Sequence, residues 1–111
     1  MKLILPLLDD DRTRPAALMA LSKLGADARE VRPWLKSERG LERALVVRIM
    51  GQQKSPDFSE IASMLDDGDW NVRTEAVKAL RNGGESAKRE VERAHLSPLG
   101  KFWAQKITAK P

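Results

Sequence analysis

The fold is decided by one stretch of sequence, residues 61–80, which runs IASMLDDGDWNVRTEAVKAL. Its second half spaces four apolar side chains along one face of a helix: Val72, Ala76, Val77 and Leu80. That spacing is typical of an α-helix that packs one side against a core. Asp69 lies just before it, in the position of an N-cap. Because an acidic turn separates its two halves, the stretch predicts a pair of helices.

The same pattern occurs earlier in the chain, so the pair is one copy of an internal repeat. The phrase Leu7-Leu8-Asp9-Asp10 corresponds to Met64-Leu65-Asp66-Asp67, which begins 57 residues later, or two periods of about 28 residues. The match continues downstream, where Arg14, Ala17, Leu18, Leu21 and Gly25 correspond to Arg73, Ala76, Val77, Leu80 and Gly84. One short pair cannot bury its apolar stripe, whereas stacked pairs form a continuous core. The sequence therefore predicts one all-α domain, residues 1–111, with repeats over 2–25, 27–51, 56–84 and 85–109.

Start and stop signals divide the repeats into helices. We expect N-caps at Asp27, at Asp69, at Ser55-Pro56 and at Ser97-Pro98. Left-handed glycines that end helices are expected at Gly25, Gly51 and Gly83-Gly84. Pro33 should bend the third helix, because it removes one backbone hydrogen bond. The expected helices cover residues 2–8, 13–24, 28–37, 40–50, 57–66, 70–82, 86–95 and 98–108.

The quoted stretch, residues 61–80, resembles a HEAT repeat of the short bacterial kind that also occurs in phycobilisome-lyase-like proteins. The resemblance implies a short right-handed α-solenoid of three to four helix pairs, whose second helices form an inner layer that binds partners. In this family, an aspartate in the turn and the arginine after it hold neighbouring repeats together. By position these are Asp67 and Arg73, with Arg14 as the equivalent arginine of the first repeat. The resemblance also implies a chromophore-lyase subunit with a pigment-bearing partner as a further hypothesis.

Composition excludes most enzyme classes. The chain has no Cys and one His, so disulfides, thiolate chemistry and His-based metal sites are not available. Asp67, Asp69 and Asn71 fill three ligand positions of a calcium loop. However, Val72 replaces the required glycine and Lys78 replaces the bidentate glutamate. We therefore predict a non-enzymatic protein with no catalytic residue, no metal and no cofactor.

Two functions from different classes remain. The first is a protein–protein interaction or scaffold module that uses the inner helices, with Arg39, Arg43 and Val47 of the second repeat and Thr74, Lys78 and Arg81 of the third as contributors. The alternative is nucleic-acid binding through the basic block 29–54, where Trp34 would stack on a base and the arginines would contact phosphates. The competing structural interpretation packs Trp34 into the protein and leaves the arginines solvated. Salt separates the two functions, because nucleic-acid affinity falls steeply as salt rises.

Charge alternates along the chain in blocks of about one repeat. The 20 Lys and Arg against 16 Asp and Glu give a net charge of +4. Residues 1–28 sum to zero, residues 29–56 to +4, residues 57–85 to −4 and residues 86–111 to +4. We expect neighbouring blocks of opposite sign to attract each other.

Both terminal helices are rich in apolar side chains. They carry Leu3, Ile4, Leu5, Leu7 and Leu8 at the first end, and Phe102 and Trp103 at the last. End repeats have a neighbour on one side only, so these helices either fold onto their own repeats or bind a second copy or a partner. The run at residues 3–8 is too short to span a membrane and does not fit a signal peptide. The absence of Cys fits a cytoplasmic location.

Overall fold

The computed structural model describes residues 4–108, which form seven α-helices, three short 3₁₀ helices and no β-strand. The elements are η1 (Leu5–Asp9), α1 (Arg14–Leu24), α2 (Ala28–Val31), η2 (Arg32–Lys36), α3 (Gly40–Gly51), α4 (Phe58–Ser63), η3 (Met64–Asp66), α5 (Trp70–Asn82), α6 (Gly84–Arg93) and α7 (Pro98–Thr108). The predicted all-α class is confirmed, and each of the eight expected segments contains helix.

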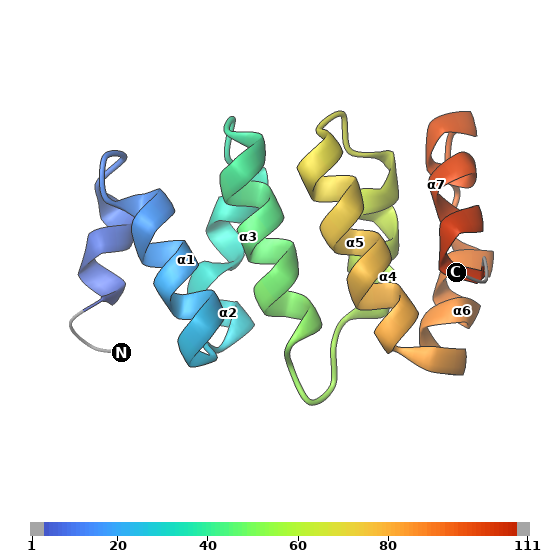
Figure 1. The fold of residues 1–111 in the computed structure, drawn as a ribbon, viewed down its shortest axis with the longest axis horizontal. Helices are drawn as coiled ribbons and strands as arrows, with labels where there is room; N and C mark the ends of the chain where they lie inside the picture. The colour runs from blue at the N-terminus through green and yellow to red at the C-terminus, as the bar shows by residue number, and fades with distance from the viewer. Residues whose placement is uncertain (1–3, 109–111) are drawn as a thin grey trace.

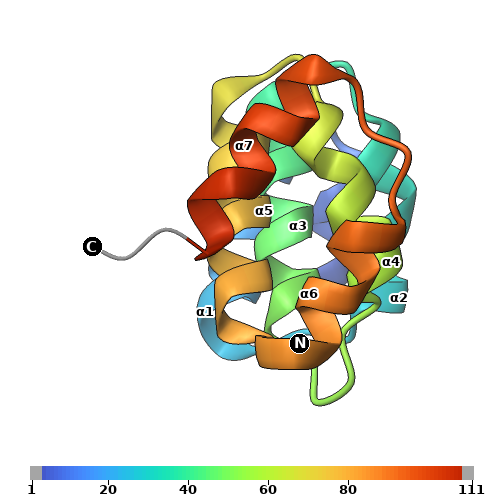
Figure 2. The same cartoon turned by 90° about the vertical axis from the view of Figure 1, so that its right-hand side faces the viewer.

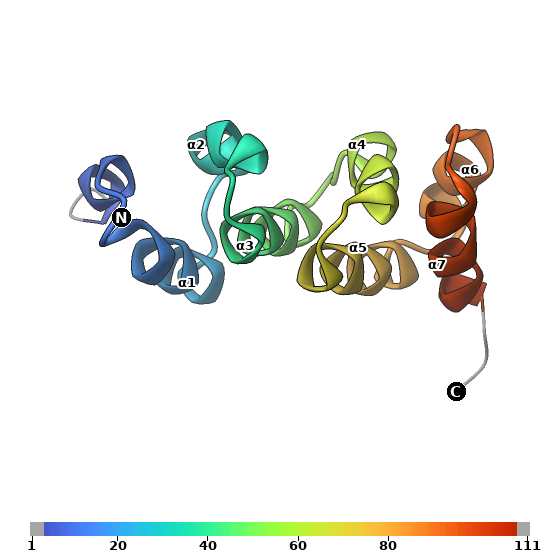
Figure 3. The same ribbon diagram turned by 90° about the horizontal axis from the view of Figure 1, so that it is seen from above.

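The helices lie in two layers. α1, α3 and α5 lie side by side in one layer (Figure 1), and η1, α2–η2 and α4–η3 form the second (Figure 3). At the far end of this row α6 packs against α4, and α7 packs across α5 and η3 (Figure 2). The whole arrangement measures 39 × 27 × 24 Å. The layers let every pair bury its apolar stripe against its neighbours.

The core lies between the two layers and consists mainly of aliphatic side chains. At most 2% of the surface is exposed at Leu8, Leu18, Leu21, Leu45, Ile49, Ile61, Leu65 and Leu80. Burying one such side chain stabilises the fold by roughly 1.5–3 kcal/mol. α3 is the most enclosed helix, because α1 and α5 pack on either side of it. It therefore forms the centre of the row.

An arginine near the start of α1, α3 and α5 makes the same hydrogen bond in each pair. Arg14 donates to the Leu8 carbonyl over 2.6 Å, Arg43 to Ser37 over 2.7 Å, and Arg73 to Asp67 over 2.7 Å. Each acceptor lies six residues before its donor. The bond satisfies a carbonyl at the end of the preceding helical segment, where intrahelical partners run out. Three pairs thus share one local geometry.

The helix starts and the proline bend agree with the sequence in most places. Asp27 and Asp69 cap α2 and α5 by accepting from the backbone N–H two residues on, over 2.9 and 2.8 Å. At Pro33 the third helix changes from α to 3₁₀ geometry. α4 differs, because Asp57 and not Ser55 is its cap, accepting from the Glu60 N–H over 3.1 Å. Phe58 donates its backbone N–H to the carbonyl of residue 56, which delays the helix start.

Two glycines follow the expectation and one does not. Gly25 and Gly84 have φ of 82° and 64°, in the left-handed region. Gly51 does not have a positive φ, so the expectation of a left-handed cap there was wrong. A Cβ at Gly51 would lie 2.7 Å from the Cβ of Ala79. Its role is to let α3 and α5 approach closely.

The first expected helix is a short 3₁₀ segment, Leu5–Asp9, with Pro6 in its first turn. Leu3 lies outside the described residues. None of the helices between residues 4 and 108 is long and apolar enough to cross a lipid bilayer.

Candidate functional site

Three of the five arginines in the basic block 29–54 pair with carboxylates of the following repeat. Arg43 makes a two-point contact with Asp67 over 3.0 and 2.9 Å, which raises the pKa of its guanidinium. Two further ion pairs, Arg32 with Glu60 and Arg48 with Glu75, each span 2.6 Å. These contacts join the positive block 29–56 to the negative block 57–85. The following repeat therefore neutralises three arginines of the block, while Arg29 and Arg39 pair with Asp27 and Glu42 of their own repeat.

The Glu42 carboxylate contacts two arginines and a serine near the start of α3. Its side chain is fully buried, and its carboxylate lies 3.4 Å from Arg14 and 3.2 Å from Arg39. The Ser37 hydroxyl donates to the same carboxylate over 2.6 Å. Arg39 also donates to the Asp11 carbonyl over 2.7 Å. Arg39 thus contributes to the contact between the first two pairs.

Val47, predicted on the inner binding surface, is buried, and Trp34, predicted to stack on a base in the nucleic-acid alternative, lies partly packed in the second layer. Val47 is fully buried within α3, so its side chain cannot touch a partner. Trp34 lies half-buried in η2, in the second layer, and the Arg14 guanidinium lies 5.3 Å from its ring centroid. The burial of Val47 was missed because helical spacing alone does not tell which face of a central helix remains open.

The three predicted residues of α5 lie together on one stripe of the helix, on which Thr74 is half-buried. Thr74 donates its hydroxyl to the Trp70 carbonyl over 2.9 Å, and Lys78 and Arg81 are exposed. The stripe begins at Trp70, because successive spacings of four, four and three residues keep Trp70, Thr74, Lys78 and Arg81 on the same helix face. That spacing is the signal that could have identified Trp70 from the sequence.

Trp70 and Phe102 are large aromatic side chains that remain open to solvent, with 65% and 57% of their surface exposed. Trp70 makes an edge-to-face contact with Trp103, with ring centroids 4.8 Å apart. The Lys106 ammonium lies 5.1 Å from the Phe102 centroid and 5.3 Å from that of Trp103. The buried Trp103 thus connects α5 to α7. We call the resulting set of residues the α5–α7 surface: Trp70, Thr74, Lys78, Arg81, Phe102 and Lys106.

The residues implied by the resemblance as inter-repeat contacts lie at boundaries between pairs. Asp67 accepts from Arg43 of the preceding pair and from the backbone N–H of Asp69. Arg73 lies 5.0 Å from the ring centroid of Trp103 in the following pair. Arg14 reaches both Glu42 and Trp34 of its following pair. Each of the three therefore contacts a neighbouring pair.

The acidic turn before α5 is occupied by structural contacts. Asp66 accepts from the Ser97 backbone N–H over 2.9 Å and from the Ser97 hydroxyl, which lowers the pKa of its carboxyl. Asp69 caps α5, as described above. Among residues 4–108, no group of three or more metal-ligating side chains is placed to hold a metal ion.

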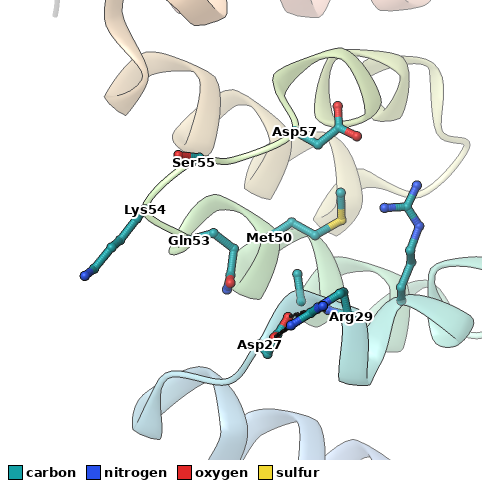
Figure 4. A pocket seen from close by; sticks show the side chains of 9 residues that line it. Asp27, Arg29, Met50, Gln53, Lys54, Ser55 and Asp57 are labelled. Carbon is teal, nitrogen blue, oxygen red and sulfur yellow. Dashed lines mark hydrogen bonds and ion pairs between the residues drawn. The ribbon is translucent and has the colours of Figure 1, made fainter.

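A hollow of about 440 Å³ lies between α2 and the loop that follows α3 (Figure 4). Arg29 is bound to Asp27 over 2.7 Å at its edge, and Met50 contributes an apolar wall. Lys54 lines it from the loop. The hollow thus mixes charges of both signs and does not contain the aromatic side chains that distinguish the α5–α7 surface.

No protein-family model, curated protein or solved structure matches this chain.

Proposed function

We propose that this chain is a short right-handed α-solenoid of HEAT-like helix pairs, a non-enzymatic cytoplasmic module that binds another protein. The recurring arginine bonds of α1, α3 and α5 support the repeat interpretation. The ion pairs between successive helix pairs, such as Arg14 with Glu42 and Arg43 with Asp67, support it as well. In a solenoid each repeat contacts mainly its neighbours, which is the pattern these ion pairs follow.

The single observation that carries the binding function is the exposed aromatic pair Trp70 and Phe102. Large aromatic side chains dominate the energy of protein interfaces when they lie on a rigid support. Trp70 makes an edge-to-face contact with Trp103, and the Lys106 ammonium lies over the ring of Phe102. Both rings are therefore held in place before any partner arrives, which lowers the entropy lost on binding.

The ion pairs of the basic block do not favour the nucleic-acid alternative. Phosphate contacts need guanidinium groups that are free to leave their present partners. Arg43 is bound at two points by Asp67, and Arg48 is bound by Glu75 over 2.6 Å. Binding a phosphate with either would break a contact between neighbouring pairs.

The test is affinity capture from source lysate, with and without nuclease treatment, using three forms of the tagged protein. These are the wild type, the double variant Trp70→Ala/Phe102→Ala, and the control Leu7→Ala/Leu24→Ala. The control removes two exposed apolar side chains, 44% and 61% exposed, far from the α5–α7 surface. Far-ultraviolet circular dichroism verifies that all three are folded.

We expect a defined protein to be retained by the wild type and the control and lost by the aromatic variant. Retention should survive moderate salt, because an interface with an apolar centre is less sensitive to screening than phosphate contacts. Equal retention by all three forms would reject the α5–α7 surface as the binding site. Loss of every retained species on nuclease treatment would reject protein binding in favour of nucleic acid.

A further inference from the structure

The α5–α7 surface carries a local excess of positive charge that no described side chain neutralises. The two helices contain five cationic residues, Arg73, Lys78, Arg81, Lys101 and Lys106. Their one carboxylate, Glu75, is bound to Arg48 of α3 over 2.6 Å. Within residues 4–108, none of these five cations forms an ion pair.

The carboxylates in the turn before α5 do not supply the missing countercharge. Asp66 is held by the backbone and hydroxyl of Ser97, Asp67 by Arg43, and Asp69 by a backbone N–H of its own helix. Both oxygens of Asp66 and Asp67 and one oxygen of Asp69 accept hydrogen bonds in these contacts. Lys78, Arg81 and Lys106 therefore remain available to an external anion.

We propose that the α5–α7 surface binds an acidic protein segment that carries an aromatic or large aliphatic anchor. The proposal rests on the proposed function and names the chemistry of its partner. The anchor packs against Trp70 and Phe102, and glutamate or aspartate side chains on either side of it meet Lys78, Arg81 and Lys106. Complementary charge of this kind sets specificity and association rate, and the apolar anchor supplies most of the affinity.

The arrangement of the rings favours a peptide over single-stranded nucleic acid. A base stacks on the open face of an aromatic ring. The Lys106 ammonium lies over Phe102 and over Trp103, and Arg73 also lies over Trp103. Trp103 is buried and a cation covers one face of Phe102, so bases would lack a continuous series of open rings to stack on. The exposed parts of Trp70 and Phe102 remain for an apolar side chain.

The proposal is tested by selecting a random peptide display library on the immobilised full-length protein. Enriched peptides are then synthesised, and their affinities are measured by fluorescence anisotropy. Each peptide is paired with a copy in which every aspartate and glutamate is replaced by asparagine or glutamine. A single-stranded oligonucleotide is measured alongside.

Two charge-reversed variants of equal net charge test whether the cations of the α5–α7 surface bind the peptide. The first is Lys78→Glu/Arg81→Glu/Lys106→Glu, on the α5–α7 surface. The matched control is Lys36→Glu/Lys54→Glu/Arg89→Glu, which reverses three exposed cations elsewhere. All six side chains lie outside the ion pairs described for residues 4–108, so both proteins are expected to fold.

We expect enriched peptides to combine an acidic excess with an apolar anchor. Their affinity should fall roughly tenfold or more for the first variant and for the neutralised peptides. The control should bind as the wild type does. Peptides that need Trp70 but lack acidic residues would overturn the proposed partner and leave the binding function standing. If no peptide is enriched, both the proposed partner and the proposed binding function are overturned. If the oligonucleotide binds more tightly than any peptide, and the first variant loses that binding, the ligand is nucleic acid and the peptide proposal is overturned.

Discussion

The basic block 29–54 and the α5–α7 surface both concentrate cations, but they use them in opposite ways. In the block, Arg32, Arg43 and Arg48 are bound by carboxylates of the following pair. On the α5–α7 surface, Lys78 and Lys106 face solvent without a carboxylate among the described side chains. The first set holds the helix row together, and the second is open to a partner.

The difference shows that local charge in a sequence does not reveal whether that charge is available. Residues 29–56 have a net charge of +4 and residues 57–85 a net charge of −4, yet Lys78 and Arg81 of the α5–α7 surface lie in the negative block. The carboxylates Glu60, Asp67 and Glu75 of that block pair with arginines of η2 and α3 instead. Whether the cations of a block are available therefore depends on the carboxylates of the segment one repeat away.

The largest effect is expected from Glu42→Ala at the centre of the contacts between the first two pairs. The change removes a fully buried carboxylate from Arg14 and Ser37, so it should lower the free energy of unfolding by about 3 kcal/mol. Urea denaturation measures the loss. Glu38→Ala is the control, because Glu38 is exposed, and its change should stay within about 0.5 kcal/mol. Equal effects would show that the contacts of Glu42 contribute no net stability.

The contrast between the two regions is tested directly by comparing Arg43→Ala with Lys78→Ala. Arg43 is 19% exposed and makes a two-point contact with Asp67, so its loss should destabilise the protein by about 2 kcal/mol. Lys78→Ala should change stability by less than about 0.5 kcal/mol but weaken binding of an acidic peptide. A large loss of stability in Lys78→Ala together with a small one in Arg43→Ala would contradict the comparison.

Gly51→Ala tests the close approach of α3 and α5, which joins the two regions. The added methyl group would lie 2.7 Å from the Cβ of Ala79, so the helices must move apart. We expect a net destabilisation of about 1 kcal/mol, although alanine favours helix more than glycine does. Gly68→Ala is the control, because nothing lies within 4 Å of its added Cβ. Thermal unfolding of both variants measures the difference.

The smallest effect concerns Asp66, which fixes α7 to η3 through Ser97. Its carboxyl pKa is lowered by hydrogen bonds from the Ser97 hydroxyl and backbone N–H. The stabilisation is therefore fully present above the ordinary aspartate pKa near 4, and it is lost as the pH falls through the lower folded-state pKa. Asp66→Asn should flatten the fall of Tm with acidification. If Tm falls with decreasing pH as steeply in the variant as in the wild type, the hydrogen bonds to Ser97 contribute nothing to the acid sensitivity.

The sequence was sufficient for the helix pattern because that information is local. Apolar spacing located α5 at residues 70–82, and the caps at Asp27 and Asp69 were identified correctly. Gly51 was misassigned because its constraint comes from Ala79 on another helix. Local rules treat a glycine near a helix end as a cap, and they carry no information about a neighbour 28 residues away.

The candidate site was predicted only in part, for a similar reason. Thr74, Lys78 and Arg81 lie together as the spacing on α5 indicated, whereas Val47 is buried because α3 has neighbours on both sides. Trp70 was missed because large aromatic residues are usually buried, and here it contacts Trp103 edge-to-face and still stays 65% exposed. Which apolar residue stays open depends on how α7 packs across α5.

The contacts between successive helix pairs join segments that are close in sequence, which bears on how the chain folds. Among residues 4–108, side-chain hydrogen bonds between elements span no more than 31 residues, as from Ser97 to Asp66. Forming the native topology therefore requires closing only short loops, which is typical of fast-folding helical proteins. The first and last helix pairs lie at opposite ends of the row (Figure 1), so opening can begin at either end while α3 stays closed. Amide hydrogen exchange should accordingly be slowest in α3 and rise towards η1 and α7.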